Sequence, residues 1–330
     1  MEKLRDVECR TCKKLRLPAA QYRAKTVTLV ISNCSKRKRV PVDSALQARD
    51  LPMGSTEAVA SAWATRIRAA AVTGRADDLY GGRAFVEARR AARESGGKLA
   101  IVSAGLGLID GHASVPAYGL TTISKDADNV LSKTAESAPD WWDALGRLSP
   151  FQSQALESEQ GLILAALPGP YLAMVADAWA LWPAERLARL RLFCRARPDS
   201  LPTALRDAWM PYDDRLDSIA VNLRGTKIDF AQRAARHFVT GIIGGGSAKQ
   251  DRDAVLAAQQ GLVARVVPVR IRLTDAEIVT TIEAHWDAVN GRSHAMLRRL
   301  RDDLGLACEQ SRFKGLFRAV ADRRARGSLL

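Results

Sequence analysis

The stretch TVTLVISNC (residues 26–34) decides the fold, because it is a short, β-branched, apolar run that leads into the polar cluster SNCSKRKR. Such a run is typical of a buried strand that runs into a loop. Two helical patterns follow, at 56–73 and 84–95, and KLAIVSAGLGLID (98–110) is a second buried strand that ends in a Gly-containing loop. The order strand, helix, helix, strand predicts an α/β domain with a parallel sheet.

Later apolar runs extend this prediction along the chain. Residues 161–169 and 189–196 are two further strand candidates, with a helix at 171–182, and the segment 224–243 is a loop followed by a helix. The small and polar stretch GGGSAKQDRD (244–253) predicts a linker. We therefore expect a basic N-terminal segment (1–25), an α/β domain (26–243), the linker (244–253) and a helical domain (254–330).

The helical C-terminal region has the pattern of a nucleic-acid-binding module. Its first helix, predicted at 274–289, opens with Thr274 and Glu277 in the spacing of a capping box. Basic helical segments follow at 291–306 and 311–324, which fits a helix-turn-helix or winged-helix arrangement. Its predicted DNA contacts are Arg292, Arg298 and Arg299. The alternative is an ordinary helical bundle with one basic face.

The charge of the chain is unevenly distributed. The 330 residues hold 50 Lys and Arg against 36 Asp and Glu, a net charge of +14. Residues 1–40 carry +9 and residues 291–330 carry +6, which leaves the middle of the chain almost neutral. Two solvated basic tails would explain this pattern, but both segments also look structured. We expect two phosphate-contacting surfaces that flank a neutral core, and a polyanionic partner.

Several classes of protein are excluded or disfavoured by the composition. No apolar run approaches about 18 residues, and the charged N-terminus lacks the apolar core of a secretion signal, so we expect a cytoplasmic protein without a membrane partner. Five cysteines do not make a disulfide framework, and the single CxxC pair, Cys9 and Cys12, is a weak zinc signal. Walker A and GxGxxG patterns are absent in the required context. We predict no cofactor and no metal.

Polar residues gather where the first two predicted strands end. In open α/β sheets, ligands bind beyond the carboxyl ends of the strands. If the two strands are neighbours, their loops line one crevice, with two tyrosines as a wall. The predicted substrate-binding residues are Ser35, Lys36, Tyr80, Ser103, Gly105 and Tyr118.

Asp110 and Asn33 are the candidate catalytic residues of this crevice. A carboxylate at a strand end can orient water or stabilise positive charge on a sugar, although Asp110 precedes a glycine and could simply cap a turn. Asn33 could bind a base edge, position water or cap a turn. Lys36 could hold a phosphate or act as a Schiff-base amine. The further predicted phosphate contacts are Arg37, Lys38, Arg39, Arg224 and Lys227, the last two at a predicted helix start.

An ordered set of motifs resembles a known family. SNCSK (32–36), DLYGG (78–82), SAGLGLI (103–109) and VPAYGLT (115–121) together resemble a bacterial α/β family that is similar to the peroxide-stress DNA-binding proteins and to uracil-DNA-glycosylase-like domains. The resemblance covers about residues 26–125. It implies a uracil-DNA-glycosylase-like core that acts on nucleobases in nucleic acid. The GQDPYH-type motif of the well-known uracil glycosylases is absent, so their catalytic residues do not transfer.

One branch of this group resembles antiphage glycosylases that remove modified cytosines from phage DNA. The resemblance therefore implies a DNA glycosylase in phage defence, with double-stranded phage DNA as the partner and glucosylated hydroxymethylcytosine as the candidate base. A non-enzymatic DNA-binding protein and a base-exchanging transglycosylase are the alternatives. The sequence does not give the identity of the base.

Overall fold

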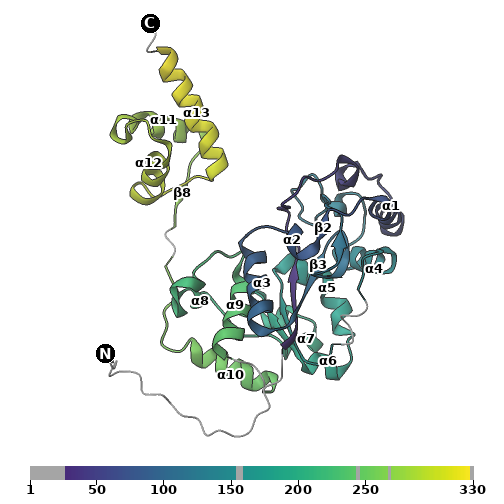
Figure 1. Ribbon diagram of the computed structural model, residues 1–330. Helices are drawn as coiled ribbons and strands as arrows, with labels where there is room; N and C mark the ends of the chain where they lie inside the picture. Colours follow the sequence, from purple (N-terminus) through teal and green to yellow (C-terminus); the bar gives the residue numbers. More distant parts are fainter. Residues whose placement is uncertain (1–26, 154–158, 243–245, 267–268, 328–330) are drawn as a thin grey trace, which may run out of the picture. The chain divides into compact units, whose positions relative to one another are not determined.

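The computed structural model describes residues 27–153, 159–242, 246–266 and 269–327, which belong to two compact units (Figure 1). The first unit ends at Ala264 and the second begins at Arg265. The predicted basic segment 1–25, with Cys9 and Cys12, lies outside the described residues.

A five-stranded sheet forms the centre of the first unit. Its strand order is β4-β3-β1-β6-β7, in which β1, β3, β6 and β7 are parallel. The expectation of an α/β fold with a mostly parallel sheet is confirmed. The sheet strands are β1 (Val27–Asn33), β3 (Lys98–Ser103), β4 (Gly107–Asp110), β6 (Leu162–Ala166) and β7 (Leu190–Phe193), and a separate antiparallel pair joins β2 (Gly74–Arg75) to β5 (Ser114–Val115).

Helices cover both faces of this sheet. The chain moves in one direction from β1 to β3 and in the other from β6 to β7. Right-handed crossovers then place α3, which precedes β3, and α5, which precedes β7, on opposite faces, although α1 of the β1–β3 connection packs with α4 on the face of α5. Helices α3 and α9 pack together on one face, and α1, α4 and α5 form the group on the other (Figure 1). The helices are α1 (Thr56–Ala69), α2 (Ala76–Leu79), α3 (Arg83–Ser95), α4 (Ala138–Leu148), α5 (Gly169–Ala180), α6 (Ala184–Ala188), α7 (Thr203–Arg206), α8 (Leu216–Ile219), α9 (Phe230–His237) and α10 (Ala248–Ala258).

The segment 98–110, expected as a strand that ends in a Gly-containing loop, continues past that loop into a second strand and forms a hairpin. Strand β3 ends at Ser103, the chain turns at Gly107 with a φ of 86°, and β4 returns antiparallel to β3. Glycine readily adopts a positive φ, so the chain can reverse at Gly107 without strain. The direction of β4 decides where its far end, which includes Asp110, lies relative to β3.

The predicted linker at 244–253 is wrong for most of its length. Residues 248–258 form α10, which begins with a capping box between Ser247 and Gln250. Asp251 of this helix accepts a hydrogen bond of 2.6 Å from the buried Arg191 of β7, and Val255 belongs to the core of the first unit. The small and polar residues of this stretch therefore form the start of a helix and not a linker. The boundary between the units lies at 264/265 instead.

The second unit is a small helical module with its own core. Strands β8 (Ile271–Arg272) and β9 (Leu306–Ala307) pair in parallel, and the helices are α11 (Asp275–Ala284), α12 (Ser293–Arg298) and α13 (Gln310–Gly327). The capping box between Thr274 and Glu277 is confirmed. The rings of Trp286 and Phe317 stack with centroids 4.9 Å apart. Among the described residues, no helix is long and apolar enough to cross a membrane.

Candidate functional site

The carboxyl ends of β1 and β6 meet at the point where the strand order reverses, which is the expected ligand position in such a sheet. In this protein that position is filled by Gln232 of α9. Its Nε2 lies 3.2 Å from Ser32 Oγ, 2.8 Å from Asn33 Oδ1 and 3.0 Å from Ala166 O. The Asn33 Nδ2 donates to Cys34 O at 2.6 Å. Both ends of the Asn33 amide are engaged within the chain, which does not fit the predicted role in catalysis or base reading.

The loop after β1 is held to the turn that precedes α3. Ser35 Oγ donates to Gly81 O at 2.7 Å, Gly81 N donates to Arg37 O at 2.8 Å, and Arg39 N donates to Leu79 O at 2.9 Å. The Ser35 hydroxyl therefore connects two backbone segments by hydrogen bonding, which does not fit its predicted role in substrate binding. The same ties leave the side chains of Arg37 and Arg39 exposed to solvent.

Two predicted wall residues, Tyr80 and Tyr118, are fully buried. Their hydroxyls are 3.0 Å apart, and Ser103 Oγ lies 2.5 Å from the Tyr118 hydroxyl. Burial raises the pKa of both phenols, so both stay protonated. A ring with no exposed face cannot stack on a flipped base, and Ser103 is buried too. These three residues instead link the end of β3 to the segments that follow α2 and β5.

Gly105 leaves room for this cluster. A Cβ atom at Gly105 would lie 2.5 Å from Tyr118 Cε2. Gly105, predicted to contact substrate, is therefore packed closely against the Tyr118 ring inside the protein. We expect Gly105→Ala to lower the free energy of unfolding by about 1–3 kcal/mol, as overpacking does. The measurement is a denaturant unfolding curve. As a control, Gly146→Ala in α4 meets no atom within 4 Å and should gain about 0.5–1 kcal/mol; equal stability of the two variants would contradict the packing argument.

An open cavity of about 180 Å³ lies beside the loop that follows β1, next to the Tyr118 ring. It adjoins the loop that follows β1, and Tyr118 links it to Ser103 at the end of β3, so it sits at the carboxyl edge of the sheet. An engineered cavity of about 150 Å³ binds benzene, so this volume suits a single six-membered ring. The lining residues are Lys36, Lys38, Val42, Gln47, Arg49, Tyr118, Gly119, Leu120, Thr121, Asp126 and Asp128.

Two carboxylates in this lining were not predicted from the sequence. Asp126 pairs with Lys36, and Asp128 accepts hydrogen bonds of 2.9 and 2.7 Å from Nε and Nη2 of Arg49. The hydrogen bond from Lys36 lowers the pKa of Asp126, and that from Arg49 lowers the pKa of Asp128, so both are ionised at neutral pH. The sequence feature that could have indicated these carboxylates is SKDADN (124–129), which begins three positions after the end of the motif VPAYGLT (115–121).

The two lysines of the loop after β1 have different surroundings. The Lys36 side chain is 71% exposed and pairs with Asp126. Lys38 points inward, where its Nζ lies 4.3 Å from the centre of the Tyr118 ring and donates to Ser35 O at 2.9 Å. Burial lowers the pKa of Lys38. Lys38 therefore does not fit the predicted role of a surface phosphate contact.

Asp110, the predicted catalytic carboxylate, lies away from this edge. Because β4 runs antiparallel to β3, Gly107 is opposite Ser103 and Asp110 is opposite Ala100. Three residues of strand correspond to about 10 Å toward the amino end of β3. Asp110 Oδ1 accepts a hydrogen bond of 2.7 Å from His112 N, as a turn cap does. The expectation that Asp110 and Asn33 share one crevice is wrong.

The loop before α9 also differs from its prediction. Helix α9 starts at Phe230, and the buried Asp229 stands at its N-cap, where its carboxylate accepts from Thr226 N at 2.8 Å. An acidic side chain already occupies the region that would attract an anion. Arg224 and Lys227 are exposed on the loop before the helix and are not phosphate ligands of its first turn.

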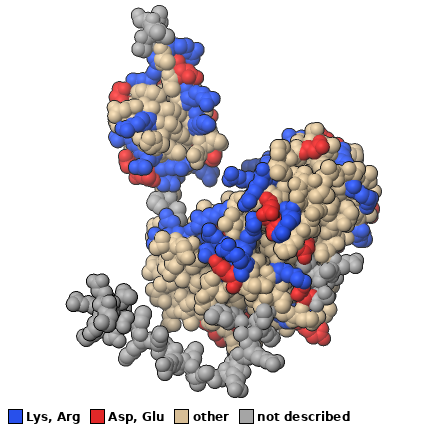
Figure 2. Space-filling model, viewed as in Figure 1, with Lys and Arg blue, Asp and Glu red and all other residues tan. Residues whose placement is uncertain are grey.

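Cations gather on the surface of the first unit. Figure 2 shows Lys and Arg side chains grouped on the viewed face of this unit, with fewer Asp and Glu among them. Within the described parts of the chain, no carboxylate pairs with four of the predicted phosphate contacts. A groove of about 590 Å³ along α3 adds more cations, among them Arg93 and Lys98. The four unpaired residues are Arg37, Arg39, Arg224 and Lys227.

The three arginines of the second unit that were predicted to contact DNA differ in how available their side chains are to a phosphate. Arg299 lies 4.0 Å from Asp303, and Arg292 Nε donates to Val289 O at 3.4 Å. Arg298 is exposed and lines a groove of about 610 Å³ together with His294 and Lys314. Arg298 is therefore the most available of the three for a phosphate.

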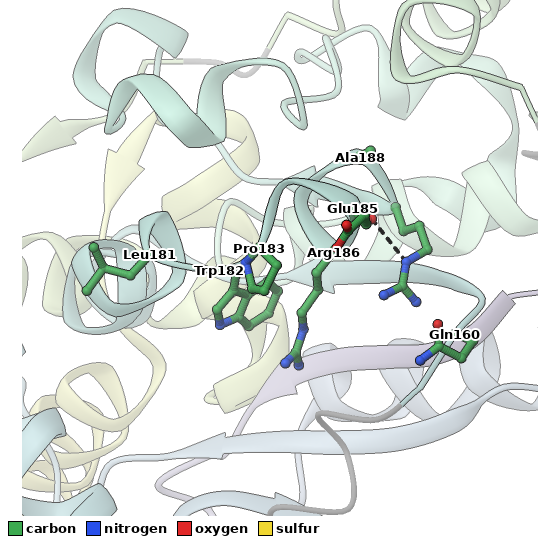
Figure 3. Close-up of a pocket in the computed structure, with 8 residues that line it drawn as sticks. Gln160, Leu181, Trp182, Pro183, Glu185, Arg186 and Ala188 are labelled. Atoms are coloured by element: carbon green, nitrogen blue, oxygen red, sulfur yellow. Dashed lines mark hydrogen bonds between the residues drawn. The ribbon is translucent and has the colours of Figure 1, made fainter.

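A wider cavity of about 920 Å³ lies elsewhere on the first unit (Figure 3). Its Gln160 and Arg189 directly precede β6 and β7, so it is at the amino edge of the sheet, where open α/β sheets do not bind their ligands. The guanidinium of Arg186 covers the Trp182 ring at 3.8 Å, and Arg189 Nε donates to Glu185 O at 3.1 Å (Figure 3). This cavity holds no pair of carboxylates.

The described residues contain no group of three or more His, Cys, Asp or Glu that could hold a metal ion. Comparison of the chain with protein-family models, curated proteins and solved structures found no match.

Proposed function

We propose that the protein is a DNA N-glycosylase that excises a modified base from phage DNA and leaves an abasic site. The observation that carries this proposal is the cavity of about 180 Å³ at the carboxyl edge of β1, sized for one ring and lined by two ionised carboxylates. Enzymes that act on a base must take it out of the stack, at a cost of a few kcal/mol. Edge hydrogen bonds in the cavity would offset that cost.

The unpaired cations next to this cavity would hold the DNA backbone. Arg37 lies on the loop between the cavity residues Lys36 and Lys38, so a strand bound there would pass the cavity mouth. The second unit, in which the sequence predicts a helix-turn-helix, would bind the duplex through Arg298 and Lys314, which line one groove. The glucosyl group of a modified cytosine would project past Lys36 and Arg49 at the rim, because the cavity itself fits only the ring.

In the proposed reaction, the bond between C1′ of the deoxyribose and the base nitrogen breaks. Positive charge develops on the sugar, and the Asp126 carboxylate stabilises it and orients a water molecule toward C1′. The water oxygen bonds to C1′, one of its protons passes to Asp126, and the base leaves with the electron pair of the broken bond. Lys36, which lies beside Asp126, would stabilise the negative charge on the departing base.

The test is mass spectrometry of the bases released from modified and unmodified phage DNA, combined with a search for alkali-labile abasic sites. Release of a modified base supports the proposal. Tight duplex binding without release would instead identify a non-enzymatic DNA-binding protein. Incorporation of a labelled free base would identify a transglycosylase.

Binding should depend steeply on salt, because cations that contact phosphates release counterions. We expect Arg37→Ala and Lys227→Ala each to reduce the slope of log K against log[salt] by about 1, similarly for all DNA sequences. Titration of labelled duplex at several salt concentrations measures this slope. The control is Arg147→Ala, because Arg147 already pairs with Glu57 at 2.8 Å on the helical layer that contains α1 and α4. A slope that changes only in the control would exclude the proposed DNA path.

A further inference from the structure

We propose that Lys38 is an imine-forming amine, which captures the aldehyde of a ring-opened deoxyribose at an abasic site. This activity goes beyond base excision, since hydrolysis of the glycosidic bond needs no covalent bond to the protein. The imine would keep the protein covalently bound to the reactive abasic site that base removal leaves in DNA.

The surroundings of Lys38 carry this proposal. Its side chain lines the cavity and is packed against two aromatic rings, with Nζ 4.3 Å from the centre of Tyr118 and 5.4 Å from that of Tyr80. Among the described residues, its only hydrogen-bond acceptor is Ser35 O, at 2.9 Å, and no carboxylate pairs with it. A buried amine that packs on aromatic rings and forms no ion pair with a carboxylate is an arrangement that favours lysine as a nucleophile.

The protonation of Lys38 agrees with this geometry. Burial is the largest cause that lowers its pKa, and the neighbouring Lys36 acts in the same direction, while Cys34 and Asp128 oppose the shift. A lowered pKa increases the neutral fraction of the amine, which is the form that attacks a carbonyl. Lys36 differs, because its exposed ammonium is paired with Asp126.

The covalent step balances without any added reagent. The lone pair of neutral Nζ attacks C1′ of the aldehyde to give a carbinolamine. This intermediate then loses its oxygen as water and forms a C=N bond between Nζ and C1′. Asp126 and Asp128 line the same cavity and could move the proton that the departing hydroxyl requires.

The experiment uses the full chain and duplex DNA that carries a preformed abasic site, with sodium cyanoborohydride to reduce the imine to a stable secondary amine. We expect a covalent protein–DNA adduct, which peptide mapping places on Lys38. Because the substrate has no base to remove, failure of the glycosylase proposal would not affect this result.

Arginine variants make the assignment specific. Lys38→Arg keeps the positive charge but cannot form the imine, and it should reduce the adduct yield at least tenfold. Lys125→Arg, an exposed lysine next to Asp126, should retain the adduct. Melting curves check that Lys38→Arg folds; if it does not, mapping of the wild-type adduct decides alone. No wild-type adduct, or an adduct on another lysine, would overturn the proposal.

Discussion

Asp126→Asn is expected to lower the rate of base release by about 100- to 1,000-fold, the loss typical of removing a group that stabilises transition-state charge. The asparagine retains the Oδ1 acceptor for Asp128 N, which now lies 3.0 Å from Asp126 Oδ1, so the loop fold should persist. It loses the negative charge that faces the developing positive charge on the sugar. Single-turnover release of the modified base measures the effect.

The matched control for this prediction is Asp110→Asn. It makes the same chemical change in a carboxylate that lies toward the amino end of β3 and caps a turn. We expect its base release to equal that of the wild type. The reverse result, an inactive Asp110→Asn and an active Asp126→Asn, would move the active site to the other carboxylate.

Asp251→Asn is expected to lower the free energy of unfolding of the first unit by about 3–5 kcal/mol. Its partner Arg191 has a side chain that is 0% exposed, and the Asp251 side chain is only 6% exposed. Removal of the carboxylate charge leaves the buried guanidinium without a counter-charge. The melting temperature should fall by roughly 6–20 °C for a unit of this size, measured by circular dichroism.

Asp207→Asn is the control for the buried pair. Asp207 lies 3.7 Å from Arg252, the residue after Asp251, but its side chain is 96% exposed. Exposed pairs contribute at most about 1 kcal/mol, so its melting temperature should change little. Equal losses from the two substitutions would show that burial does not determine the strength of the Arg191–Asp251 pair.

Much of the secondary structure could be predicted because its causes are local. The β-branched run at 26–34 became β1, the runs at 161–169 and 189–196 became β6 and β7, and the Thr274 and Glu277 pair caps α11. In the segment 98–110 the returning strand β4 was not predicted, because a continuous apolar run does not show where a buried chain reverses. The polar stretch at 244–253 failed because a helix N-terminus favours the same small residues as a linker.

The candidate site could be predicted only in part. Lys36, Lys38 and Tyr118 do line the cavity, since the end of a buried strand is recognisable in the sequence. Tyr80 and Ser103 do not line it, but both form hydrogen bonds with the Tyr118 hydroxyl. Asp126 and Asp128 were missed because their loop carries no strand-end pattern, and only its folding against Lys36 and Arg49 makes them part of the site.

The sequence by itself determined the α/β class, the excess of positive charge and the segment around residue 33 as the place to look for a site. The tertiary structure alone decided which carboxylates lie there. The antiparallel direction of β4 moved Asp110 away from the carboxyl edge, and the burial of Lys38 turned an apparent surface cation into a cavity amine. The physical reason is that periodicity and capping act between neighbours in the chain, whereas strand direction, burial and ion pairing depend on residues far apart in sequence.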